Sequence, residues 1–190
     1  MSNRDTYAPG PAAGARIQKG EETWTLVLVR ELRHPPAKVW QALTDPAELS
    51  EWAPFDADRS LAAVGPAKLT TIGAPAGYAV TETTVKRADP PKALEYSWGG
   101  GDIRWELQPL GSNGTRLTLW SNINRAWIAA GAAGWHICFD VLDRLLEGDP
   151  LGRMVGPELM HFEGWQRLTA EYAQQLGVEA PAWQPNAPKR

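Results

Sequence analysis

Ionisable side chains on predicted strands are the first candidates for chemistry in this sequence. Arg30 shares its predicted strand face with four apolar residues, Trp24, Leu26, Leu28 and Leu32. That pattern predicts a partly buried guanidinium, and a buried charge needs a partner because leaving it unpaired is costly. Two roles follow for Arg30: a polar group of an acid–base site, or a structural ion pair with Glu82 or Glu95.

Four further ionisable residues on predicted strands complete the acid–base candidates: Glu82, Tyr96, Arg104 and Glu106. Arg104 and Glu106 alternate away from Trp105 and are expected to be exposed. Arg30, Glu82 and Tyr96 therefore remain as groups that could transfer protons among apolar walls.

Other reactive side chains fit structural roles better than chemistry. His136 and Asp140 are spaced for two metal ligands on one helix face. Asp140 adjoins Asp143 and Arg144, which is typical of a hydrated helix surface, so we expect no metal and no cofactor. The single cysteine, Cys138, lies on or beside an apolar stripe, where a thiol is usually inert.

Sequence motifs for phosphate binding and for nucleophilic catalysis are absent. The three glycines at residues 99–101 lead into a strand, so no helix N-terminus faces a phosphate. No G-x-S-x-G nucleophile motif occurs.

The composition is that of a globular chain with a substantial core. The 190 residues carry a net charge of −3, which favours neither nucleic acid nor an anionic membrane surface. One cysteine excludes an intramolecular disulfide, and no apolar run is long enough for membrane insertion. We expect a cytoplasmic protein. Ten tryptophans against three phenylalanines are unusual, and their rings could line a semi-polar interior as well as fill a core.

The candidates are positioned by a predicted sheet followed by helices. A long strand is expected over residues 22–33, then two short helices at 36–43 and 46–52, each begun by a proline. Further strands are expected over residues 60–64, 67–72, 78–88, 93–98, 102–110 and 115–122. Gly99–Gly101 and Gly111–Gly114 join the last three as hairpins, which predicts an antiparallel sheet.

The helical part of the chain follows the sheet. Residues 132–148 carry apolar residues at helical spacing, and a second helical pattern covers residues 157–177. Whether that second segment continues the first helix or packs separately is left open. A disordered leader is expected over residues 1–20, a single domain over 21–178 and a flexible tail over 179–190.

Four segments in this order resemble the activator of heat-shock-protein-90 ATPase homologue-like family of the SRPBCC, or START-like, superfamily. They are HPPAKVWQALTDPAELSEW, ADPPKALEYSW, RWELQPLGSNGTRLTL and GWHICFDVLDRLLEG. The resemblance implies an α+β helix-grip fold, with a curved antiparallel sheet of about six or seven strands wrapped around a long C-terminal helix. The sequence departs from the family in lacking a histidine after TRLTL, where Trp120, Ser121 and Asn122 stand.

The helix-grip resemblance also implies a deep hydrophobic cavity between sheet and helix. We expect it to bind an apolar or aromatic small molecule, with an enzyme (cyclase, hydrolase or dehydratase) and a co-chaperone-like interaction protein as alternatives. A chaperone partner is not favoured, because the chain has no room for a second, chaperone-binding domain; a homodimer stays open. The residues expected to contact the ligand are Trp98, Trp105, Trp120, Trp127, Trp135, Phe139, Leu142, Arg30 and Tyr96.

Overall fold

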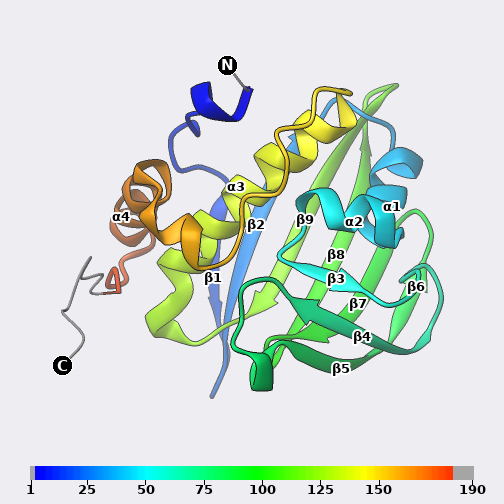
Figure 1. The fold of residues 1–190 in the computed structure, drawn as a ribbon, viewed down its shortest axis with the longest axis horizontal. Coiled ribbons are helices and arrows are strands. Elements are labelled where there is room, and N and C mark those ends of the chain that lie inside the picture. The colour runs from blue at the N-terminus through cyan, green and yellow to red at the C-terminus, as the bar shows by residue number, and fades with distance from the viewer. Residues whose placement is uncertain (1–2, 182–190) are drawn as a thin grey trace.

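The computed structural model describes residues 3–181, and its largest element is a six-stranded antiparallel sheet. The strand order is β1-β2-β9-β8-β7-β6. The bounds are Ala15–Lys19 (β1), Trp24–Leu32 (β2), Arg87–Asp89 (β6), Ala93–Trp98 (β7), Gly101–Leu110 (β8) and Gly114–Asn122 (β9). A smaller sheet of order β3-β4-β5 consists of Phe55–Ala57, Gly65–Thr71 and Val80–Val85. Figure 1 shows how the larger sheet curves beneath the helices.

Four α-helices and several short 3₁₀ segments complete the fold. The α-helices are Pro36–Thr44 (α1), Pro46–Trp52 (α2), Ile128–Leu146 (α3) and Glu163–Leu176 (α4). The 3₁₀ segments are Asn3–Thr6 (η1), Ala76–Tyr78 (η2), Arg125–Trp127 (η3) and Pro157–His161 (η4). Prolines begin α1 and α2, and the Asp45 carboxylate caps α2 by accepting from the backbone N–H groups of Ala47 and Glu48.

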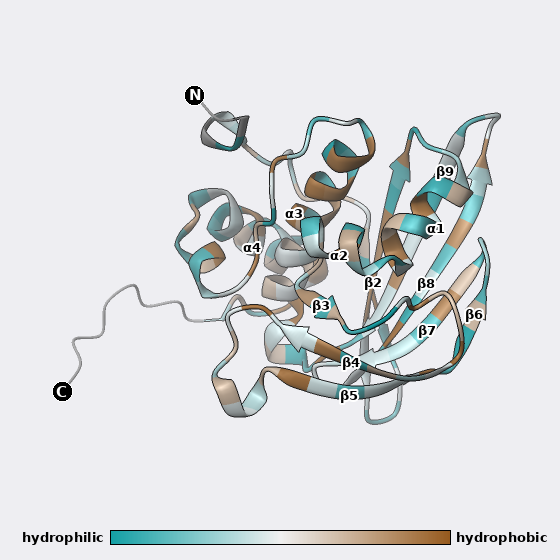
Figure 2. Ribbon diagram, turned by 45° about the vertical axis from the view of Figure 1, so that its right-hand side comes forward, coloured by the Kyte–Doolittle hydropathy of each residue, from teal (hydrophilic) through white to brown (hydrophobic). Residues whose placement is uncertain are grey.

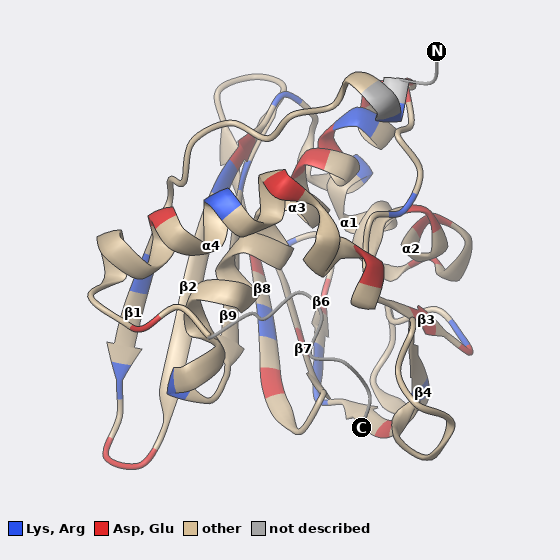
Figure 3. Ribbon diagram, turned by 60° about the vertical axis from the view of Figure 1, so that its left-hand side comes forward, with Lys and Arg blue, Asp and Glu red and all other residues tan. Residues whose placement is uncertain are grey.

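Helix α3 lies across the concave face of the larger sheet, and α4 packs beside it (Figure 1). Buried residues occur on more than one side of α3, because the sheet covers one face and α4 covers another. Figure 2 shows this apolar character as brown along much of α3. The charged residues of α3 are Asp140, Asp143 and Arg144, all in its C-terminal half (Figure 3). The N-terminal half is therefore free to border an apolar space.

The predicted α+β helix-grip architecture is confirmed, with two short helices after β2 and a long helix over the sheet. The long helix begins at Ile128, four residues before the predicted start. The question left open for residues 157–177 is answered by the structure: they form η4 and then α4, a separate helix beside α3.

Several local predictions are wrong. Residues 15–19 of the expected disordered leader form β1, whose backbone pairs with β2 from Ala15 opposite Leu28 to Lys19 opposite Trp24. Residues 60–64 form bends rather than a strand, and the buried Leu61 donates its backbone N–H to the Thr44 carbonyl. The strand expected over 78–88 is divided into β5 and β6 at Lys86. Of the tail expected over 179–190, residues 182–190 lie outside the described part of the chain.

Candidate ligand-binding cavity

A cavity of about 880 Å³ lies between the N-terminal half of α3 and one end of the larger sheet. Its walls come from the β1–β2 turn, the β7–β8 hairpin, the end of β9 with η3, the N-terminal half of α3, and the α3–α4 connection. Among the side chains that line it are Trp98, Ser121, Ile123, Trp127, Trp135 and Cys138. A volume of this size is typical of sites that enclose small molecules.

Tryptophan rings form one wall of the cavity. The Trp98 and Trp135 rings meet edge to face, with centroids 5.8 Å apart and planes 76° from parallel. Trp98 is held in place by its indole N–H, which donates to the Thr71 hydroxyl at 2.9 Å. Trp135 also packs edge to face on the fully buried Trp105, with centroids 5.5 Å apart. This wall is therefore fixed from behind by core packing.

Small residues on α3 leave room for the cavity. Gly131, Gly134 and Cys138 all line it, and they recur at spacings of three and four along the helix. Glycine inside a helix costs about 1 kcal/mol relative to alanine, so two such residues are not explained by helix stability. A Cβ added at Gly131 would lie 2.6 Å from the Ile123 Cδ1 atom, so this glycine admits the Ile123 side chain. A Cβ added at Gly134 would meet only the Trp165 indole nitrogen of α4, at a van der Waals distance of 4.0 Å.

The Cys138 thiol borders the cavity in its neutral form. Burial is the main cause that raises its pKa to about 12. A neutral thiol is a poor nucleophile, so Cys138 contributes a small apolar surface rather than covalent chemistry.

The rim of the cavity is polar and carries an exposed ring. Asn124 caps η3 by accepting from the Ala126 backbone N–H at 2.9 Å. The Arg125 guanidinium lies over the Trp24 ring, 5.4 Å from its centroid. Trp127 is 54% exposed although it lines the cavity. An exposed ring at the mouth of an apolar cavity offers a contact to an entering ligand.

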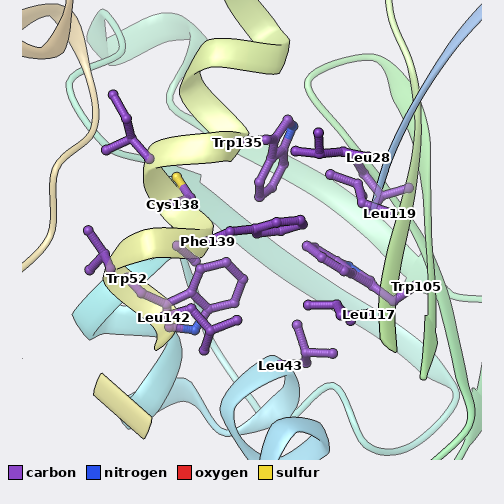
Figure 4. Close-up of a cluster of buried hydrophobic side chains, with 14 of the residues drawn as sticks. Leu28, Leu43, Trp52, Trp105, Leu117, Leu119, Trp135, Cys138, Phe139 and Leu142 are labelled. Atoms are coloured by element: carbon purple, nitrogen blue, oxygen red, sulfur yellow. The ribbon is translucent and has the colours of Figure 1, made fainter. Parts of the chain in front are cut away.

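Of the nine residues predicted to contact a ligand, the structure brings three together in the cavity: Trp98, Trp127 and Trp135. Four others lie in the core beneath it and do not line it: Tyr96, Trp105, Phe139 and Leu142. Figure 4 shows the Phe139 and Trp105 rings below Trp135, and their planes are tilted by 46° from each other. The Trp105 indole N–H donates to the Tyr96 hydroxyl at 2.9 Å, and burial raises the pKa of Tyr96.

The remaining two predicted contacts lie elsewhere. Trp120 is opposite Val27 on β2 and lies on the other face of the sheet, where the Arg104 guanidinium covers its ring at 4.8 Å. Arg30 does pair with a carboxylate, but neither Glu82 nor Glu95 is the partner. It donates to Asp140 on α3 at 2.6 Å. Glu82 is exposed near Lys68.

Asp140 and His136 belong to a buried polar cluster rather than to the hydrated helix surface that the sequence suggested. The Tyr7 hydroxyl donates to Asp140 at 2.6 Å, and the His136 Nδ1 lies 2.7 Å from the Tyr172 hydroxyl. Burial is the main cause that lowers the pKa of His136. The cluster ties the N-terminal segment and α4 to α3, because Tyr172 also donates to the Ala13 carbonyl.

Sequence reasoning missed several residues that shape the cavity, among them Gly131, Gly134, Ser121 and Ile123. The two glycines carried a usable signal, since glycine is unfavourable within a helix. Ser121 and Ile123 gave no such signal. Strand alternation assigns a side chain to one face of the sheet, but it does not show which part of that face is left uncovered by helices. Among residues 3–181, no three His, Cys, Asp or Glu side chains gather as metal ligands. Within the same residues, no helix combines the length and apolarity that crossing a bilayer requires.

Comparison with known proteins identifies the family. The profile of the "Activator of Hsp90 ATPase homolog 1-like protein" family matches residues 33–147. The chain belongs to this family. The match runs from just before α1 to the end of α3, so the family region contains the Trp98–Trp135 wall and the two α3 glycines of the cavity, Gly131 and Gly134. No curated protein matches the sequence.

Solved structures share the fold of this family member at low sequence identity. The protein EF2215 of Enterococcus faecalis, of unknown function, matches with a TM-score of 0.65 and 16% identity over 85% of this chain and 89% of its own. CalU16 from Micromonospora echinospora matches with a TM-score of 0.60 and 22% identity over 88% and 98%. DynU16, a protein in the dynemicin biosynthetic locus, matches with a TM-score of 0.57 and 21% identity over 69% and 50%. These likenesses establish the fold.

Proposed function

We propose that this protein binds an apolar or aromatic small molecule in the cavity beside α3. The observation that carries the proposal is the cavity of about 880 Å³ walled by Trp98 and Trp135. Burying apolar ligand surface there would contribute roughly 25 cal/mol per Å². The wall is preformed, since core packing and the Trp98–Thr71 hydrogen bond hold both rings, and a preformed wall reduces the entropic cost of binding.

The enzyme alternative finds little support in the groups proposed for it. Arg30, Glu82 and Tyr96 do not line the cavity. Arg30 is engaged by Asp140, Glu82 is exposed, and the Tyr96 hydroxyl accepts from Trp105 inside the core. A proton-transfer group must lie within hydrogen-bond reach of its substrate, which these three positions do not offer to a molecule in the cavity.

Native mass spectrometry of the protein purified from its own cells tests the proposal. We expect a bound small molecule that is released on unfolding and that raises the melting temperature when it is added back. Gly134→Leu, which adds a bulky side chain at a residue that lines the cavity, is expected to lose that ligand while it stays folded. The absence of any carried ligand, together with no thermal shift from a broad panel of apolar and polycyclic aromatic compounds, would overturn the proposal.

A further inference from the structure

The Ser121 hydroxyl is a polar group in the cavity wall that has no hydrogen-bond partner among residues 3–181. In the sheet, Ser121 lies opposite Leu26 and Ile103, whose side chains are buried on the concave face. Ser121 itself is 5% exposed and lines the cavity. Within residues 3–181 its hydroxyl makes no hydrogen bond, and the oxygen is not among the fully buried unpaired atoms. A molecule in the cavity can therefore reach it.

The Trp135 indole N–H is a second such group, contributed by α3. Trp135 is also 5% exposed and lines the same cavity. The indoles that pack against it, Trp98 and Trp105, donate to Thr71 and Tyr96, whereas the described chain offers no acceptor to Trp135. Figure 4 shows the Trp135 nitrogen at the end of the ring that is turned away from Phe139.

Free donors in a cavity wall limit which molecules bind there well. Ser121 from the sheet and Trp135 from the helix line the same cavity, beside apolar side chains such as Ile123 and Val155. A bound molecule that displaces water from these donors without offering an acceptor loses their hydrogen bonds. An indole N–H can only donate, so a group that satisfies Trp135 must be an acceptor.

From this juxtaposition we infer that the cavity recognises flat aromatic molecules that carry an uncharged carbonyl oxygen, which accepts hydrogen bonds from Ser121 and Trp135. This inference rests on the proposed function and names the chemical class of its ligand. A carbonyl oxygen has two lone pairs and can accept from both donors. The aromatic body of the ligand would pack against the Trp98–Trp135 wall.

A carboxylate suits the same position less well. The cationic side chain that lines the cavity is Arg125, which is exposed at the rim and covers Trp24. The charged residues of α3 lie beyond the cavity, in its C-terminal half (Figure 3). Moving an ionised group from water to an apolar site without a charged partner is far more costly than moving a ketone.

Binding of 9-fluorenone and of fluorene, measured by equilibrium dialysis, tests the inference. The two molecules differ by one carbonyl oxygen, and an apolar cavity without donors would prefer fluorene, because the ketone loses its hydrogen bonds to water on entry. We expect the wild-type protein to bind 9-fluorenone more tightly, by roughly threefold to tenfold for each hydrogen bond formed. Ser121→Ala and Trp135→Phe are each expected to reduce this preference.

Matched variants outside the cavity separate this effect from general damage. Ser50→Ala removes an exposed hydroxyl on α2, and Trp40→Phe makes the same ring change on α1. Both are expected to keep the wild-type preference. If both compounds bind with equal affinity, or if Ser121→Ala and Trp135→Phe leave the preference unchanged, the inference is wrong while the proposed function stands. If neither compound binds, the inference is also wrong, and the proposed function is decided separately by the carried ligand and the wider compound panel.

Discussion

Arg30 on β2 donates to Asp140 on α3 across 2.6 Å, and this ion pair joins the sheet to the helix that walls the cavity. The two side chains are 26% and 15% exposed, so the pair is largely withdrawn from water. Asp140 also accepts from Tyr7, and Arg30 lies over the Phe139 ring at 6.0 Å. One carboxylate therefore connects the N-terminal segment, the sheet and α3.

Removal of this carboxylate should destabilise the protein strongly. Asp140→Ala leaves a largely buried guanidinium and a tyrosine hydroxyl without their acceptor, so we expect a loss of about 3 kcal/mol in the free energy of unfolding. Urea denaturation measures the loss. Asp89→Ala, which removes the exposed partner of Arg87, is the control and should cost less than about 1 kcal/mol. Equal losses from the two variants would show that Asp140 is no more than a surface charge.

Loss of the Tyr96 hydroxyl should affect stability and leave binding unchanged. Tyr96→Phe leaves the buried Trp105 indole N–H without its acceptor, which should lower the free energy of unfolding by about 1–3 kcal/mol. Because Tyr96 does not line the cavity, affinity for an apolar aromatic ligand should stay at the wild-type level. Thermal denaturation and a binding titration on the same preparation check both parts. A large loss of affinity in the folded variant would contradict the assignment of Tyr96 to the core.

Two tryptophans predicted from the sequence should behave differently in binding. Trp98→Ala removes part of the cavity wall and is expected to weaken ligand binding by at least about tenfold, which corresponds to about 1.4 kcal/mol. Trp120→Ala alters the other face of the sheet, beneath Arg104, and should leave affinity unchanged. Fluorescence titration of both variants makes the comparison. If the two variants lost affinity to a similar degree, the ligand would contact both faces of the sheet. That result would contradict binding in the cavity.

Acidification should weaken the fold through His136. Burial lowers its pKa in the folded state below the ordinary value of 6.5, so the unfolded chain binds the proton more readily. The stability from neutral His136 is full above about pH 6.5 and is lost as the pH falls toward the folded-state pKa, by at most about 1.4 kcal/mol per pH unit.

Unfolding free energies measured between pH 7.5 and 5 test this behaviour. His136→Gln should show a shallower decline than the wild type over that range. An identical slope in the wild type and in His136→Gln would rule out His136 as the group responsible.

The sequence predicted the helices and strands of this fold well. It did not predict which of their surfaces are left uncovered and border the cavity. Helical spacing located α3, and hairpin turns located β7, β8 and β9. β1 was missed because a five-residue strand between Gly14 and Gly20 has little pattern of its own and is defined by pairing with β2. The Arg30–Asp140 pair spans 110 positions in the chain, so no local pattern could select Asp140 over Glu82 or Glu95.

The candidate site was predicted only in part, for a related reason. Alternation along β9 already placed Trp120 on the other face of the strand from Leu117 and Leu119. The sequence alone could therefore have ruled out Trp120 as a ligand contact. Trp105 and Trp135 could not be told apart in this way, because both lie on buried faces. What separates them is their depth in the fold, since Trp135 lines the cavity and Trp105 is fully buried within the core.

The central claim, that the space beside α3 binds an apolar aromatic molecule, is tested most directly by titration with the uncharged fluorescent compound N-phenyl-1-naphthylamine. The wild-type protein should enhance its fluorescence saturably, with one site per chain. Gly134→Leu adds a bulky side chain to the cavity lining and should abolish the fluorescence signal. Gly77→Ala, whose added Cβ lies in open space at η2, should retain the signal. A saturable signal of the same strength in Gly134→Leu, or no saturable signal in the wild type, would contradict the account.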